Sequence, residues 1–185
     1  MAFPPAVTRA PEPAAVSAPS WVLYDDTFEV EIAAHEPDRR APMASTTKLM
    51  TALLVMENSA LTDVVTISRQ AEITAHKQIR VRRGDTWTVQ ELLEALMVVS
   101  ANDAAVALAE HIGGDVGSFV VMMNERASQL GLANTAYVNP HGLDSVDQYT
   151  SARDLVVLAQ AVMDHPELAA LAAQERAELI DAAGK

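Results

Sequence analysis

The pattern of apolar and polar positions predicts helices in the middle of the chain and strands mainly near its N-terminus. Five stretches place apolar residues at helical spacing, behind a capping residue or ahead of a glycine. They predict helices over residues 45–58, 88–99, 102–111, 119–130 and 151–163. The first is apolar on nearly all sides, so we expect it to lie in the core.

Local signals predict where three of these helices begin. Thr88-Val89-Gln90-Glu91 has the form of a capping box. Asn102 or Asp103 is expected to cap the helix that follows, and Thr150 or Ser151 the last one.

Four short stretches are predicted to be strands, because they are apolar or alternate apolar with polar residues. They are Trp21–Tyr24, Phe28–Ile32, Val64–Ile67 and Ile79–Val81. Residues 1–20 are rich in Pro and Ala, which predicts a disordered linker. We therefore expect one folded domain over residues 21–185.

Composition and charge exclude several classes of function. The chain has 185 residues, 50% of them hydrophobic, which is enough for one domain with a sizeable core. Its formal net charge of −12 argues against a surface for nucleic acid. There is no cysteine, and the five histidines lack zinc-binding spacing, so no metal site is predicted. No membrane anchor is recognisable, since no apolar run reaches the ~18 residues of a membrane span. No signal peptide is recognisable either, since the N-terminus lacks the apolar run of about 7–15 residues that one requires.

The segment Ser45-Thr46-Thr47-Lys48 opens the first predicted helix and is a candidate for nucleophilic catalysis. A spacing of three puts Ser45 and Lys48 on one helix face, where the amine can act as base for the hydroxyl. Burial and the helix dipole both favour the neutral amine that a base requires. Ten serines and three lysines give about 0.16 chance matches to this pattern, so an N-cap serine beside a solvent-exposed lysine is an alternative.

A second candidate, Ser100-Ala101-Asn102, lies at the junction of two predicted helices. Such a turn can point a hydroxyl and a carboxamide into a cleft, although simple helix capping explains the same residues. The two motifs together are more specific than either one. Their order, Ser45-x-x-Lys48 and then Ser100-x-Asn102, is that of the penicillin-recognising serine enzymes.

Longer segments resemble the D-alanyl-D-alanine carboxypeptidases, the low-molecular-mass penicillin-binding proteins of the DacA type. RRAPMASTTKLMTALLVMEN is similar to the nucleophile segment of that family, and ELLEALMVVSANDAAVALAEHIGG to its second motif and following helix. FVVMMNERASQLGLANTAYVNPHGLD and YTSARDLVVLAQAVMDHPEL resemble its next two segments. The resemblance extends from about Trp21 to Lys185.

The resemblance implies a mixed α/β fold, the serine β-lactamase or DD-peptidase fold, in which an antiparallel sheet packs with helices beside an all-helical subdomain. It implies removal of the terminal D-alanine from peptidoglycan stem peptides on the extracytoplasmic side of the membrane, without a cofactor, and acylation by β-lactams. Ser45 would be the nucleophile, Lys48 the general base, Ser100 a proton relay, and Asn102 would orient Lys48 and the substrate. His141, in the segment Asn139–Gly142, is interpreted as a loop residue near the rim of the site.

The family's third motif, Lys-Thr-Gly on a strand beside the cleft, does not occur in this sequence. In relatives it lies about 100 residues beyond the second motif, and Ile180–Lys185 resembles the segment just before that region. We therefore expect an incomplete sheet beside an open slot.

Three alternatives remain open at this point. One is a non-catalytic peptidoglycan-binding fragment, which the missing third motif favours. Another is a transpeptidase of the same superfamily, which differs in the acceptor that reaches the acyl-enzyme. The third is a class A β-lactamase, which uses a Glu about 36 residues after its second motif. Position 136 is Ala136, and no Glu lies between Arg126 and Pro166, which argues against this alternative.

Overall fold

The computed structural model describes residues 16–176, which form two small antiparallel sheets and a cluster of helices. The predicted mixed α/β class is confirmed. One sheet pairs β1 (Trp21–Asp25) with β2 (Val30–His35), and the other pairs β3 (Val64–Thr66) with β4 (Thr86–Thr88). Most of the predicted linker, residues 1–15, and the segment 177–185 lie outside the described residues.

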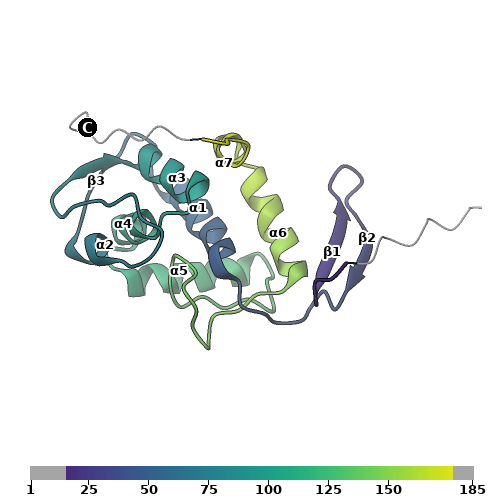
Figure 1. Cartoon of the computed structure of the whole chain (residues 1–185). Coiled ribbons are helices and arrows are strands. Elements are labelled where there is room, and N and C mark those ends of the chain that lie inside the picture. Colours follow the sequence, from purple (N-terminus) through teal and green to yellow (C-terminus); the bar gives the residue numbers. More distant parts are fainter. Residues whose placement is uncertain (1–15, 177–185) are drawn as a thin grey trace, which may run out of the picture.

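The helical cluster forms the main body of the described chain (Figure 1). A short 3₁₀ turn, η1 (Ala44–Thr46), leads directly into α1 (Thr47–Asn58). The other helices are α2 (Arg69–Ile73), α3 (Val89–Val98), α4 (Asn102–Gly113), α5 (Val116–Gln129), α6 (Ala152–Met163) and α7 (Pro166–Ala172).

Helix α1 lies at the centre of the core, as its apolar sequence predicted. It packs against α3, α4, α5 and α6, and the side chains of Met50 and Leu53 are fully buried. Leu92 of α3 and Leu108 of α4 are equally buried. Because α4 packs on both α1 and α3, this core fixes the turn between α3 and α4 beside the start of α1.

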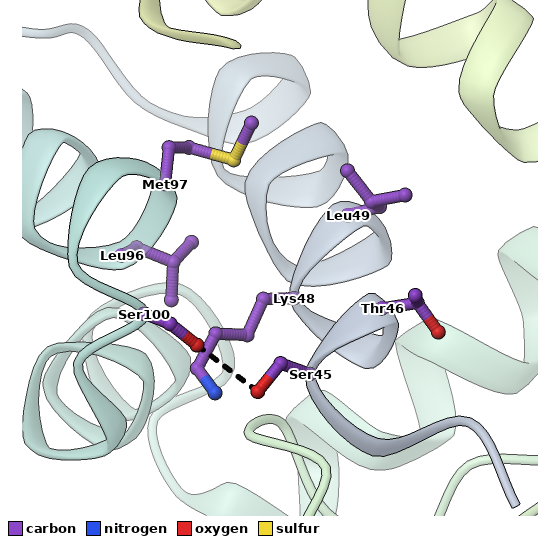
Figure 2. A pocket seen from close by; sticks show the side chains of 7 residues that line it. All are labelled: Ser45, Thr46, Lys48, Leu49, Leu96, Met97 and Ser100. Carbon is purple, nitrogen blue, oxygen red and sulfur yellow. Dashed lines mark hydrogen bonds between the residues drawn. The ribbon is translucent and has the colours of Figure 1, made fainter. Parts of the chain in front are cut away.

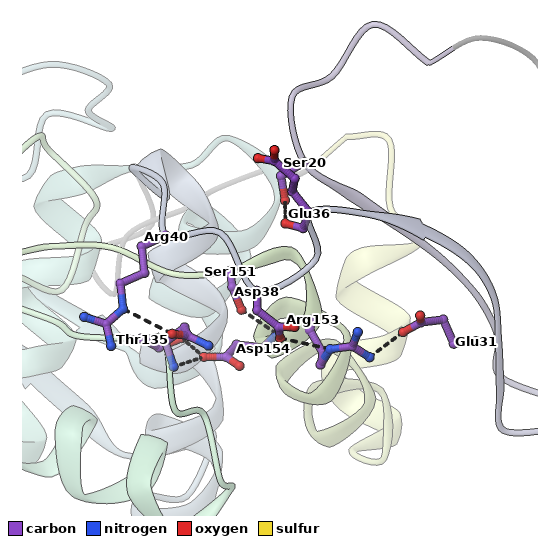
Figure 3. A network of polar contacts seen from close by, with 10 residues as sticks. Ser20, Glu31, Glu36, Asp38, Arg40, Thr135, Ser151, Arg153 and Asp154 are labelled. Carbon is purple, nitrogen blue, oxygen red and sulfur yellow. Dashed lines mark hydrogen bonds and ion pairs between the residues drawn. The ribbon is translucent and has the colours of Figure 1, made fainter.

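The β1–β2 hairpin lies to one side of the helices, next to α6 (Figure 1). Polar contacts help to attach it (Figure 3). The Arg153 guanidinium, in the first turn of α6, pairs with Glu31 of β2 and with Asp38, the latter at 3.0 Å. Gln160 Nε2 donates to Asp26 Oδ1 at 3.0 Å. These contacts are exposed, so each contributes at most about 1 kcal/mol.

Two of the predicted helix caps are confirmed and one is wrong. Thr88 and Glu91 form the reciprocal capping box, and Ser151 Oγ accepts from Asp154 N. Helix α4 instead has Ala101 at its N-cap, without a side-chain cap. Asn102 and Asp103 lie inside the first turn of α4, and their side chains bind other parts of the molecule.

The predicted strand Ile79–Val81 is also wrong, because these residues pair with no strand in the described part of the chain, residues 16–176. The Asp103 carboxylate instead accepts hydrogen bonds from their three successive amides, at 2.9 to 3.2 Å. Helix α5 begins at Val116, three residues earlier than predicted, because Asp115 Oδ1 accepts from Ser118 N and caps it. The elements α2, β4 and α7 were not predicted.

In residues 16–176 no single helix is long and apolar enough to cross a membrane. Two bent helix pairs, α4 with α5 and α6 with α7, are long and apolar enough only when the two helices are taken together, and this rests on length and composition alone.

Candidate active site

Ser45 lies in the 3₁₀ turn η1, exposed at the N-terminal end of α1. The preceding residue, Ala44, has a positive φ of 45°, which is uncommon for a residue with a Cβ. Backbone strain of this kind, at about 1–3 kcal/mol, persists only where the surroundings enforce it. Close packing against Gly142 does so here, since a Cβ added at Gly142 would lie 1.8 Å from the Ala44 carbonyl oxygen.

Lys48 lies one turn further along and is almost completely buried, at 3% exposure. Its Nζ donates to Asn102 Oδ1 at 2.8 Å and to the His141 carbonyl oxygen at 2.6 Å. Burial lowers the pKa of Lys48 to about 8, and the positive charge of Lys77 contributes to the shift. Both acceptors are uncharged, so within residues 16–176 no carboxylate bonded to Nζ holds the proton on it. A neutral amine can donate to both oxygens and keep its lone pair for the proton of Ser45.

Ser100 and Asn102 reach the same place from the turn between α3 and α4. Ser100 also has a positive φ, 60°, and its Oγ donates to Ser45 Oγ at 3.0 Å. The carboxamide of Asn102 is fixed at both ends, because Nδ2 donates to the Ala75 carbonyl at 3.0 Å while Oδ1 accepts from Lys48. Figure 2 shows the Lys48 amine beside the hydroxyls of Ser45 and Ser100, which are joined by their hydrogen bond.

Ser45, Lys48 and Ser100 line an open slot of about 300 Å³. Its walls are mainly apolar, formed by Leu49 of α1 and by Leu96 and Met97 of α3 (Figure 2). An apolar wall beside Lys48 keeps water from the amine and favours its neutral form. The slot therefore places a serine hydroxyl and a buried amine beside an open, mainly apolar space.

The loop Asn139–Leu143 completes the support of the nucleophile. Thr51 Oγ1, in α1, donates to the Pro140 carbonyl at 2.7 Å. His141 contributes through its backbone oxygen to Lys48, whereas its ring Nδ1 accepts from Leu143 N at 3.2 Å. Burial, with a contribution from Lys48, lowers the pKa of His141 to about 4, so the ring is neutral at pH 7. The sequence located this loop near the rim, but not the bond from its backbone to Lys48.

The structure brings together all four residues predicted for the site, as expected. The alternatives based on helix capping are wrong. Lys48 is buried rather than solvent-exposed, and the N-cap of α1 is Thr46. The side chains of Ser100 and Asn102 bond across the slot, and neither caps α4. The catalytic roles of these residues stay predictions. Among residues 16–176 no three His, Asp or Glu side chains are grouped to hold a metal ion.

A nucleophile turn before a buried lysine, with a serine and an asparagine from a second helix junction, defines a site of the penicillin-recognising serine enzyme type. The chain belongs to the peptidase S11 family, D-alanyl-D-alanine carboxypeptidase, whose profile matches residues 6–181.

Individual relatives and solved structures agree with this assignment. DacA of Haemophilus influenzae, a D-alanyl-D-alanine carboxypeptidase, is 38% identical over 164 residues, which cover 84% of this chain and 42% of that protein. The crystal structure of DacD from Francisella tularensis matches with a TM-score of 0.83 at 34% identity, over 86% of this chain and 40% of that one. The crystal structure of a D-alanyl-D-alanine carboxypeptidase from Mycobacterium tuberculosis matches with a TM-score of 0.85 at 30% identity, over 90% of this chain and 64% of that one.

These similarities confirm the predicted DD-peptidase-like fold and the family. The chain spans about two fifths of the length of the curated relatives it matches.

Proposed function

We propose that this protein is a serine-type D-Ala-D-Ala carboxypeptidase that removes the terminal D-alanine from peptidoglycan stem peptides. Ser45 attacks the carbonyl of the penultimate D-alanine, and its proton passes to Lys48. Ser100 relays a proton to the nitrogen of the departing D-alanine, while Asn102 orients Lys48 and the substrate. Water then attacks the ester on Ser45 and releases the shortened peptide. β-Lactams acylate the same serine.

One observation carries this proposal more than any other. Lys48 is buried, with a pKa lowered to about 8, and both of its hydrogen-bond partners are neutral oxygens. A lysine that only formed an ion pair would be expected to have a carboxylate as its partner. Here the environment stabilises an amine that can accept a proton near neutral pH, one turn from a serine hydroxyl.

Substrate and location follow from the family rather than from the geometry. The matched relatives are named as D-alanyl-D-alanine carboxypeptidases, and one similar solved structure is a penicillin-binding protein from Escherichia coli. We therefore propose an extracytoplasmic protein whose partners are peptides ending in D-Ala-D-Ala and β-lactam antibiotics. The comparisons favour neither a non-catalytic fragment nor a class A β-lactamase.

Release of D-alanine tests the proposal. The full-length protein is incubated with diacetyl-L-Lys-D-Ala-D-Ala, and free D-alanine is measured with a D-amino-acid oxidase. Release is expected from the parent and from Ser59→Ala, a half-buried serine at the C-terminal end of α1, and not from Ser45→Ala. If D-alanine is released at the parent rate by Ser45→Ala, or not at all by the parent, the proposal is wrong.

A further inference from the structure

A run of positive charge lies close to the site in an otherwise acidic protein. Lys77, Arg80, Arg82 and Arg83, here called the cationic strip, are four of the 13 basic residues in a chain of net charge −12. All four are exposed. Within residues 16–176 none of them pairs with a carboxylate, whereas four other arginines do. The charge of the strip is therefore available to a ligand.

The backbone of the strip is held in place by carboxylates that leave its side chains unpaired. Asp103, only 1% exposed, accepts from the amides of residues 79–81. Asp85 Oδ2 accepts from the amide of Arg82 at 3.1 Å. The side chain of Val81 is buried, and the side chains of the arginines on either side of it are exposed. The cations are thus presented on a fixed backbone, which lowers the entropy cost of binding an anion.

Contacts with the candidate active site place the beginning of the strip next to it. Asn102 N donates to the Lys77 carbonyl at 2.7 Å, and Asn102 Nδ2 donates to the Ala75 carbonyl at 3.0 Å. Asn102 is the residue whose Oδ1 accepts from Lys48. The charge of Lys77 also acts on Lys48, which agrees with this proximity. A substrate bound beside Ser45 therefore lies within reach of the strip.

We propose that the cationic strip binds a carboxylate of the substrate peptide that is additional to its C-terminal one. This inference rests on the proposed function. A protein with a net charge of −12 repels acidic peptides over most of its surface, so a local cluster of cations is needed to attract one. Seven residues span at most about 25 Å, which suits one acidic peptide better than a long polyanion. The strip thereby makes the enzyme selective for acidic donor peptides.

The test compares two peptides that differ in one charge. N-Acetyl-Glu-(Nε-acetyl-Lys)-D-Ala-D-Ala and its Gln counterpart are supplied to the parent protein and to Arg80→Gln/Arg82→Gln, and kcat and KM for D-alanine release are measured. The matched control is Arg39→Gln, another exposed arginine. In the double variant, kcat/KM for the Glu peptide should fall about three- to tenfold, mostly through KM, while the Gln peptide changes less than twofold. High salt should remove the parent's preference for Glu.

Each result decides the matter. Equal changes with both peptides, or an equal change in Arg39→Gln, would overturn the role of the strip while leaving the proposed function in place. The role of the strip in binding the peptide is also overturned if the double variant hydrolyses both peptides as the parent does and loses only the binding of an anionic wall polymer. If the parent releases D-alanine from neither peptide, the proposed function fails, and the assignment of the strip fails with it. Acylation by a fluorescent penicillin at the parent rate shows that the double variant is folded.

Discussion

Replacing Lys48 by Arg distinguishes a base from a simple positive charge. If Lys48 only supplied charge, Arg would preserve much of its effect. If it accepts the proton of Ser45, Arg fails, because the guanidinium keeps its proton at any usable pH. We therefore expect Lys48→Arg to be almost as damaging to acylation as Lys48→Ala.

The magnitude follows from the two pKa values. With a pKa of about 8, Lys48 is neutral in about one molecule in ten at pH 7. An arginine at this position would stay protonated, because the pKa of a guanidinium lies far above any pH at which the protein works. The population able to accept a proton is thus almost entirely lost, and the rate should fall to the level set by Lys48→Ala. In the parent, acylation should rise about tenfold per pH unit below pH 8 and level off above it, because Lys48 loses its proton as the pH rises.

The assay is the rate of acylation by a fluorescent penicillin, with the melting temperature of each variant recorded in parallel. Lys77→Arg is the matched control, since it makes the same substitution at an exposed lysine beside the site, and should acylate at the parent rate. A folded Lys48→Arg protein that acylates within about tenfold of the parent would refute the role of base. So would a parent rate that does not change between pH 6 and pH 8.

Two further substitutions test the support of the site. Gly142→Ala should cost about 3 kcal/mol or more and greatly slow acylation, because its Cβ would lie 1.8 Å from the Ala44 carbonyl. The control is Gly114→Ala, which is also at a positive φ but has nothing within 4 Å, so it should cost only about 1 kcal/mol and leave acylation unchanged. If the two substitutions lower the melting temperature equally, the close contact at Gly142 is contradicted. Asp103→Asn should slow acylation and lower the melting temperature, because a carboxamide oxygen cannot accept from all three amides that Asp103 binds. A buried donor left without a partner costs about 1–3 kcal/mol. An unchanged acylation rate would show that the segment held by Asp103 does not support Asn102.

The sequence predicted those parts of the fold that depend on local signals. The capping box from Thr88 to Glu91 and the cap at Ser151 determine helix ends through neighbouring residues alone, and both were predicted correctly. The buried helix α1 also followed from its own composition. Helix α7 has Pro166 at its first position, a usual start signal that would have identified it.

Where long-range contacts decide the structure, the sequence was insufficient. Asp103 is a residue type that often caps a helix, but its carboxylate accepts from amides 22 to 24 residues away. These bonds prevent Ile79–Val81 from pairing as a strand. The contribution of His141 comes from a backbone oxygen, which no residue type reveals. The four predicted site residues were found together because two motifs with a known separation were considered jointly, since each motif alone had a capping explanation.

Peptide mapping after acylation tests the central claim most directly. The full-length protein is labelled with a β-lactam, digested and analysed by mass spectrometry. The account predicts that the adduct lies on the peptide that contains Ser45, at that serine, and that Ser45→Ala carries no label. An adduct on Ser100, or labelling that persists in Ser45→Ala, would contradict it.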